Sequence, residues 1–117
     1  MLTIKKSEFI KSAAGQKGFF TDGRPQIAVA GKSNVGKSSF INFIANHGKL
    51  ARTSNTPGRT QLINYFDFGP FILTDLPGYG YAKVAKAEKA GWGALIESYL
   101  LGEPTLARVI QLVDIRH

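Results

Sequence analysis

Short, mainly apolar runs alternate along the chain with polar segments rich in Gly and Pro. Apolar runs bounded by Gly, Pro or Asp are typical of strands buried in a sheet. Apolar residues spaced three and four apart instead predict helices with one buried face. The sequence therefore predicts strands at residues 27–30, 62–68, 71–74 and 109–113, and helices after residue 37 and around residues 92–100.

Two features refine this outline. Gly69-Pro70 separates the second and third runs, so they predict an antiparallel hairpin. Gly48 follows the first helix as a C-terminal stop, and Gly102 with Pro104 ends the second, whose apolar stripe we interpret as core packing. The predicted apolar faces are Phe40, Ile41, Phe43 and Ile44 in the first helix, and Trp92, Leu95, Ile96, Tyr99 and Leu100 in the second.

The N-terminal residues carry a weaker pattern. Ser7 precedes Phe9, Ile10 and Ala13 at helical spacing, which predicts a short helix capped by Ser7. Residues 15–26 hold three Gly and one Pro, so they predict a loop. We therefore expect residues 1–26 to form an N-terminal extension, a short helix and a loop, ahead of the main domain.

Composition narrows the function classes. The chain has 117 residues, of which 44% are hydrophobic and 20% charged, as in an ordinary globular domain. The absence of Cys excludes a disulfide framework and a cysteine-ligated metal. We find no signal peptide or membrane-spanning run, so we expect a cytoplasmic protein without a membrane partner. The net charge of +7 favours encounter with polyanions.

The most specific chemical motif follows the strand predicted at residues 27–30. Residues 31–38 read GKSNVGKS, which matches the phosphate-binding loop (P-loop) pattern G-x-x-x-x-G-K-[ST]. Its glycines let backbone amides approach a phosphate, and the next helix adds its positive N-terminus. Lys37 would place a positive charge on the β- and γ-phosphates, and the Ser38 hydroxyl would ligate magnesium. The motif predicts a nucleoside triphosphate site with Mg²⁺.

Two further residues extend this site. Asp75 ends the third apolar run, where its carboxylate can reach the magnesium shell beside the P-loop, although a loop cap is the alternative role. Gly78 completes D-x-x-G, whose glycine amide can bond a γ-phosphate. Thr60, in the long polar loop before the hairpin, could close a second hydroxyl onto magnesium. Spacing alone does not separate it from its rivals Thr53, Ser54 and Thr56.

Together these motifs resemble one family. The segments GKSNVGKSSFIN, ARTSNTPGRTQLINYF, DLPGYGYAK and LVDIRH are similar to the EngB (YihA/YsxC) family of ribosome-biogenesis GTPases. The likeness runs from about residue 9 to the last residue, with Lys32 where the family usually has Arg. It implies a Ras-like P-loop GTPase fold of α/β class, with a mixed, mostly parallel sheet and helices on both faces. Residues 27–117 would be the N-terminal part of that domain, with its C-terminal part absent.

Carried over position by position, the resemblance implies the site residues. Lys37, Thr60 and Gly78 are the catalytic candidates, and Ser38, Thr60 and Asp75 serve magnesium, Asp75 through water. GTP or GDP is the implied ligand, and the large ribosomal subunit with its RNA is the implied partner. The implied nucleotide-binding residues are Gly31, Lys32, Ser33, Asn34, Val35, Gly36, Lys37, Ser38, Ser39, Thr56, Pro57, Gly58, Arg59, Thr60, Asp75, Leu76, Pro77 and Gly78.

Two positions bear on hydrolysis. Tyr79 stands where Ras-like enzymes have the Gln that orients the attacking water, so we predict slow intrinsic hydrolysis that a partner accelerates. Some GTPases without that Gln resemble this chain in having Asn at the position of Asn34, where it holds a potassium ion. Potassium bound through Asn34 is therefore a further cofactor hypothesis.

Basic residues gather in three segments, two of which would respond to the γ-phosphate. Such residues are usually solvated surface, but their placement suggests RNA contacts coupled to the nucleotide state. The residues are Lys5, Lys6, Lys11 and Lys17 near the N-terminus, Lys49, Arg52 and Arg59 in the polar loop, and Lys83, Lys86 and Lys89 after D-x-x-G.

The sequence leaves base selectivity open. GTPases of this class read guanine through [NT]-K-x-D, and no such tetrapeptide occurs in the chain. An ATP-using P-loop enzyme or kinase, or a phosphate-binding fragment without turnover, are therefore alternatives. The strand at residues 109–113 would also lie exposed at a sheet edge, so we expect self-association or strand exchange.

Overall fold

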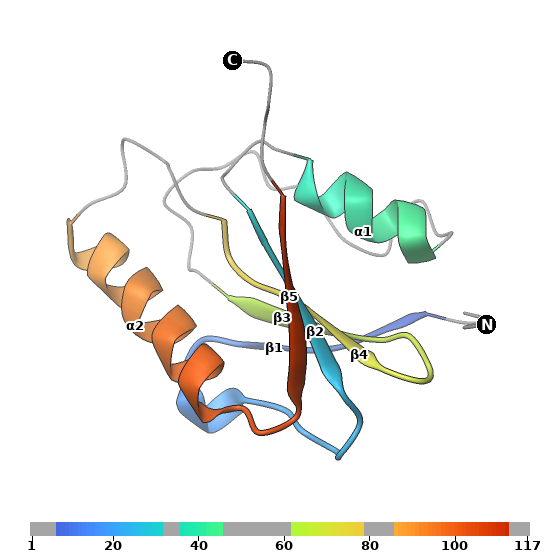
Figure 1. The fold of residues 1–117 in the computed structure, drawn as a ribbon. Helices are drawn as coiled ribbons and strands as arrows, with labels where there is room; N and C mark the ends of the chain where they lie inside the picture. Colours follow the sequence, from blue (N-terminus) through green and yellow to red (C-terminus); the bar gives the residue numbers. More distant parts are fainter. Residues whose placement is uncertain (1–6, 32–35, 46–61, 79–85, 113–117) are drawn as a thin grey trace.

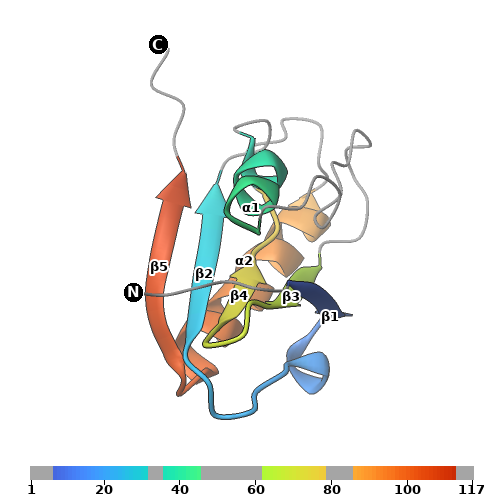
Figure 2. The ribbon, with the colours of Figure 1, turned by 90° about the vertical axis from the view of Figure 1, so that its right-hand side faces the viewer.

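The structure is a computed structural model that describes residues 7–31, 36–45, 62–78 and 86–112, of which residues 86–90 and 92 are described by their backbone. One sheet with the strand order β1-β3-β4-β2-β5 forms its centre (Figures 1 and 2). The elements are β1 (Glu8–Ala13), a 3-10 turn (Gln16–Gly18), β2 (Gln26–Gly31), α1 (Lys37–Ala45), β3 (Ile63–Asp67), β4 (Ile72–Asp75), α2 (Lys86–Gly102) and β5 (Leu106–Leu112).

The sheet is mixed, as predicted. β2 pairs in parallel with β4 on one side and with β5 on the other. β3 pairs antiparallel with β4, which confirms the predicted hairpin, and also antiparallel with β1. The predicted excess of parallel pairing is not seen within the described residues. Two pairings there are parallel and two antiparallel, because the N-terminal strand, which was not predicted, joins the antiparallel side.

The two helices cover opposite faces of this sheet (Figure 1). Successive side chains of a strand point to opposite faces, and β2 shows the consequence. Ala28 packs in the cluster that contains Leu95 and Tyr99 of α2. Val29 packs in the cluster that contains Ile41 of α1. The predicted arrangement of helices on both faces is confirmed.

The prediction of a helix near the N-terminus is wrong, because Glu8–Ala13 form the strand β1. β1 gains a ladder of backbone hydrogen bonds with β3, and Ala13 is buried where the two strands meet. The Phe9 ring also lies edge-on to Phe66 of β3, with 5.7 Å between ring centroids. These nonlocal contacts outweigh a weak local helical spacing. Residues 8–13 therefore belong to the same sheet as the rest of the domain.

The predicted apolar face of α1 needs one correction. Ile41 and Ala45 are buried, and Phe40 and Ile44 are partly buried against the same cluster. Phe43, however, is 82% exposed. A helix turns by about 100° per residue, so position 43 lies on the far side from position 41. The face that packs on the sheet therefore excludes Phe43.

The outer strand β5 is an exposed edge. Its sequence is typical of a buried strand, yet Val109 and Ile110 are 49% and 37% exposed. Only one side of β5 is paired within the described residues, and its partner there is β2. Unpaired apolar edges template pairing with another chain. Self-association through β5 stays a prediction, and a monomeric mass by light scattering at high protein concentration would contradict it.

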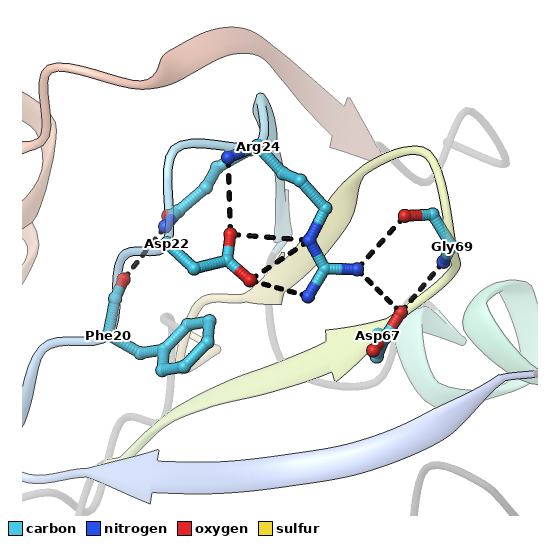
Figure 3. Close-up of polar contacts among 6 residues, drawn as sticks. Phe20, Asp22, Arg24, Asp67 and Gly69 are labelled. Atoms are coloured by element: carbon cyan, nitrogen blue, oxygen red, sulfur yellow. Dashed lines mark hydrogen bonds and ion pairs between the residues drawn. The ribbon is translucent and has the colours of Figure 1, made fainter.

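Arg24 fastens the loop before β2 to the β3–β4 hairpin (Figure 3). Its Nη1 donates to Asp67 Oδ1 at 2.8 Å and to the Gly69 carbonyl at 2.9 Å, while Nη2 donates to Asp22 Oδ2 at 2.6 Å. Hydrogen bonds from Arg24 lower the pKa of both carboxyls below their ordinary values. Arg24 therefore links the segments at the end of the sheet where β2 begins.

Candidate functional site

The ends of β2 and β4 define the site. Because these strands are parallel neighbours, Gly31 at the end of β2 and Asp75 at the end of β4 lie at the same edge of the sheet, the edge that the carboxyl ends of the strands form. The Leu76 amide continues the pairing by donating to the Val29 carbonyl at 3.0 Å. The strands that follow β2 in the chain lie on both sides of it, β3 and β4 on one side and β5 on the other. Ligands bind at such points of open α/β sheets, outside the carboxyl ends of the strands.

The helix α1 begins beside this edge. Gly36 has φ of 81°, a backbone conformation that side-chain-bearing residues rarely adopt. An added Cβ at Gly36 would meet nothing within 4 Å, so the glycine is needed for its conformation rather than for space. Its carbonyl accepts the first helical hydrogen bond, from the Phe40 amide at 2.9 Å. The positive N-terminus of α1 is thereby placed next to the ends of β2 and β4.

Lys37 and Asp75 are in direct contact across this edge. Lys37 Nζ forms an ion pair with Asp75 Oδ1, although 38 positions separate the two residues in the chain. The pair is largely buried, with side-chain exposures of 14% for Lys37 and 9% for Asp75. The P-loop and D-x-x-G, which lie far apart in the sequence, therefore meet at one place, as predicted for Asp75.

The donor set at this place suits a magnesium-bound phosphate. Carboxylate and hydroxyl oxygens are hard ligands of the kind that Mg²⁺ prefers, and Asp75 with Ser38 at the start of α1 supplies both. The Lys37 ammonium can exchange the Asp75 carboxylate for phosphate oxygens without losing a negatively charged partner. The residues present therefore fit Mg²⁺ and a polyphosphate.

The structure places part of the predicted site. Gly31, Gly36, Lys37, Ser38 and Asp75 lie at this edge of the sheet. Ser39 is exposed on α1, Leu76 and Pro77 are buried after β4, and Gly78 is half-buried. The other predicted residues lie outside the described part of the chain: Lys32, Ser33, Asn34, Val35, Thr56, Pro57, Gly58, Arg59, Thr60 and Tyr79.

Two polar residues next to Asp75 were not predicted from the sequence. Asn64 Nδ2 donates to Asp75 Oδ2 at 3.3 Å, and Ser12 Oγ donates to Asn64 Oδ1 at 2.6 Å. One signal for Asn64 was present, because it is a polar residue within the apolar run of β3. Ser12 gave no such signal, because its strand was not predicted.

A buried polar cluster supports β4 from the opposite face. The Tyr99 hydroxyl of α2 lies 2.7 Å from Gln26 Oε1 and 3.0 Å from Thr74 Oγ1, directly before Asp75. Gln26 Nε2 donates to the Phe20 carbonyl at 2.8 Å. Burial raises the pKa of Tyr99, so the hydroxyl stays a neutral hydrogen-bond partner. The strand that carries Asp75 is thus held from both sides.

Comparison with known proteins places most of the chain in one family model. Residues 26–117 match the model of a protein family described as 50S ribosome-binding GTPase. The chain belongs to this family. The matched part of this GTPase family member begins with β2, and it includes the P-loop, the hairpin and D-x-x-G.

Curated relatives of this GTPase family member carry the name "Probable GTP-binding protein EngB". The relative from Clostridium beijerinckii is 54% identical over 117 residues, which are 99% of this chain and 59% of the relative. Relatives from Clostridium perfringens and Desulfitobacterium hafniense are 56% and 52% identical, and the chain again spans 59% of their length. The predicted resemblance to the EngB family is confirmed. Among the described helices, none has the length and hydrophobicity that crossing a bilayer requires.

Proposed function

We propose that the chain is part of a cytoplasmic, magnesium-dependent GTP-binding and GTP-hydrolysing switch that acts in assembly of the large ribosomal subunit. The observation that carries this proposal is the contact between Lys37 and Asp75, because it joins the phosphate motif to the magnesium motif. The names of the relatives support GTP as the nucleotide, and the family description supports the ribosomal subunit as the partner.

Each residue has a defined task in this proposal. Lys37 binds the β- and γ-phosphates, and the amide of Gly78 senses the γ-phosphate. Ser38 and Thr60 offer hydroxyls to magnesium, and Asp75 orients a water on that ion. When bound, magnesium supplies charge neutralisation on the phosphates. The remaining P-loop residues wrap the phosphates with backbone amides.

Base selectivity tests this function against an ATP-using enzyme. We expect labelled GDP to bind about 100-fold or more tightly than labelled ADP once the chain is extended to its relatives' length. The 117 residues alone should discriminate less, because they contain no [NT]-K-x-D motif. Equal affinities for GDP and ADP in the extended chain would rule out a GTPase. Binding without any turnover of GTP would favour a phosphate-binding fragment instead.

Contact with ribosomal RNA is the second part of the proposal, and the net charge of +7 supports it. Lys11 lies on β1, Lys17 in the 3-10 turn, and Lys86 and Lys89 in the first turn of α2. The other predicted basic residues lie outside the described part of the chain: Lys5, Lys6, Lys49, Arg52, Arg59 and Lys83. Because Lys and Arg on phosphates release counterions, affinity for the large subunit should fall at least about tenfold between roughly 50 and 200 mM salt. A salt-independent affinity in sedimentation assays would contradict RNA contact.

Potassium bound through Asn34 is a third part, motivated by Tyr79 at the position of the water-orienting Gln. A monovalent cation there would offset charge that develops in the transition state. GTP turnover should therefore be faster in potassium than in sodium buffer of equal ionic strength. Equal rates in the two buffers would remove potassium from the proposal.

A further inference from the structure

A row of polar side chains crosses three neighbouring strands and ends at the P-loop lysine. Ser12 of β1 is the cross-strand partner of Asn64 of β3, and Asn64 is the cross-strand partner of Asp75 of β4. Cross-strand partners direct their side chains to the same face of the sheet. The row continues through the ion pair from Asp75 to Lys37 at the start of α1.

Hydrogen-bond chemistry gives this row a direction. A carboxylate only accepts, so Asn64 must present its amide nitrogen to Asp75 Oδ2, at 3.3 Å. The amide oxygen of Asn64 is thereby turned toward Ser12, whose Oγ donates to it at 2.6 Å. Rotating the Asn64 amide by half a turn would set two acceptors against each other at Asp75. The Asp75 carboxylate therefore fixes the orientation of Asn64, and the Ser12 hydroxyl satisfies the amide oxygen in that orientation and holds the side chain in place.

The two oxygens of Asp75 have different partners. Lys37 contacts Oδ1, whereas Asn64 contacts Oδ2. Under the proposed function Lys37 turns to the phosphates when nucleotide binds, and its hold on the carboxylate is then lost. Among the described residues Asn64 contacts Ser12 and Asp75, neither of which the phosphates would displace from it, so it can keep the carboxylate oriented in both states.

We propose that Asn64, held in place by Ser12, is a positioning residue for Asp75 at the magnesium site, and that β1 is thereby part of the nucleotide switch. This inference rests on the proposed function. Loss of a group directly behind a metal ligand typically weakens metal affinity by about 10- to 100-fold. Asp75 would hold that place behind a metal-bound water, and Asn64 lies one step further out, so we expect an effect at the low end of that range. If Ser12 and Asn64 had only a structural role, their loss would change the stability of the sheet but not the magnesium dependence of nucleotide binding.

The test is the magnesium dependence of GDP binding, measured in the length of chain that binds GDP. For Asn64→Ala we expect the Mg²⁺ concentration at half-maximal effect to rise about tenfold, with GDP affinity in chelator changed by less than about twofold. Ser12→Ala should raise the same Mg²⁺ concentration about threefold. Ser12→Thr keeps the hydroxyl, so its Mg²⁺ concentration at half-maximal effect should equal that of the wild type. Thr21→Ala is the matched control, since it removes a hydrogen bond to Glu103 at the other end of the sheet.

Melting temperatures show which variants are folded. If Asn64→Ala does not fold, the magnesium dependence of GDP binding in Ser12→Ala tests the inference. Unchanged magnesium dependence in folded Ser12→Ala and Asn64→Ala would overturn the inference and leave the proposed function intact. A wild-type chain that binds no GDP, with or without magnesium, would overturn both. A threefold shift in Thr21→Ala would also overturn the inference, because the effect would then not be local to Asp75.

Discussion

Replacement of Lys37 by Ala is expected to weaken Mg²⁺-GDP binding at least about 100-fold. The ammonium lies at the start of α1 in a largely buried position, where removal of one partner from a charged pair costs about 2–5 kcal/mol. The variant also leaves the Asp75 carboxylate without its cation, so the site repels phosphate. A fluorescence titration with labelled GDP measures the loss directly.

Lys37→Arg provides the matched control for this prediction. It keeps the positive charge but replaces a compact ammonium by a planar guanidinium, so we expect an affinity between those of the wild type and Lys37→Ala. Thermal unfolding of each variant separates loss of the site from loss of the fold. A folded Lys37→Ala variant that binds Mg²⁺-GDP within about threefold of the wild type would contradict the assignment of Lys37.

GTP turnover is expected to be slow in the free protein and at least about 100-fold faster with the large ribosomal subunit. Tyr79 replaces the Gln that orients the attacking water, so the free site has an incomplete catalytic set. Partners that complete such sites accelerate hydrolysis by about 10³- to 10⁵-fold. Phosphate release over time, with and without purified subunits, measures both rates.

The Lys37→Ala variant with subunits is the control here, since its turnover should stay near background. Turnover at tens per second by the free protein would show that Tyr79 leaves the catalytic set complete. An unchanged rate in the presence of subunits that demonstrably bind the protein would remove the ribosome as the accelerating partner.

The parts of the fold that follow from local signals were predicted from the sequence. The step from β2 to α1 rests on an apolar run followed by the P-loop, and the β3–β4 hairpin rests on Gly69-Pro70 between two apolar runs. Both signals lie within a few residues of the elements that they specify. The parallel neighbours β2 and β4 then bring Lys37 to Asp75, as the two motifs together had indicated.

The parts that depend on distant partners were not predicted. β1 is a strand because β3 lies beside it, and its own residues show only a weak helical spacing. Phe43 was assigned to the buried face because apolar character alone does not say which way a side chain points. Ser12 and Asn64 join the site only through strand register, which no local pattern encodes.

A crystal structure of the protein with magnesium and a non-hydrolysable GTP analogue would test the proposed nucleotide site directly. We expect Lys37 Nζ to leave Asp75 and to lie within hydrogen-bond distance of the β- and γ-phosphate oxygens. We also expect Ser38 on the magnesium ion and Asp75 on one of its waters, with Asn64 still hydrogen-bonded to the carboxylate. A nucleotide bound elsewhere, with the ion pair between Lys37 and Asp75 unchanged, would contradict the proposed site.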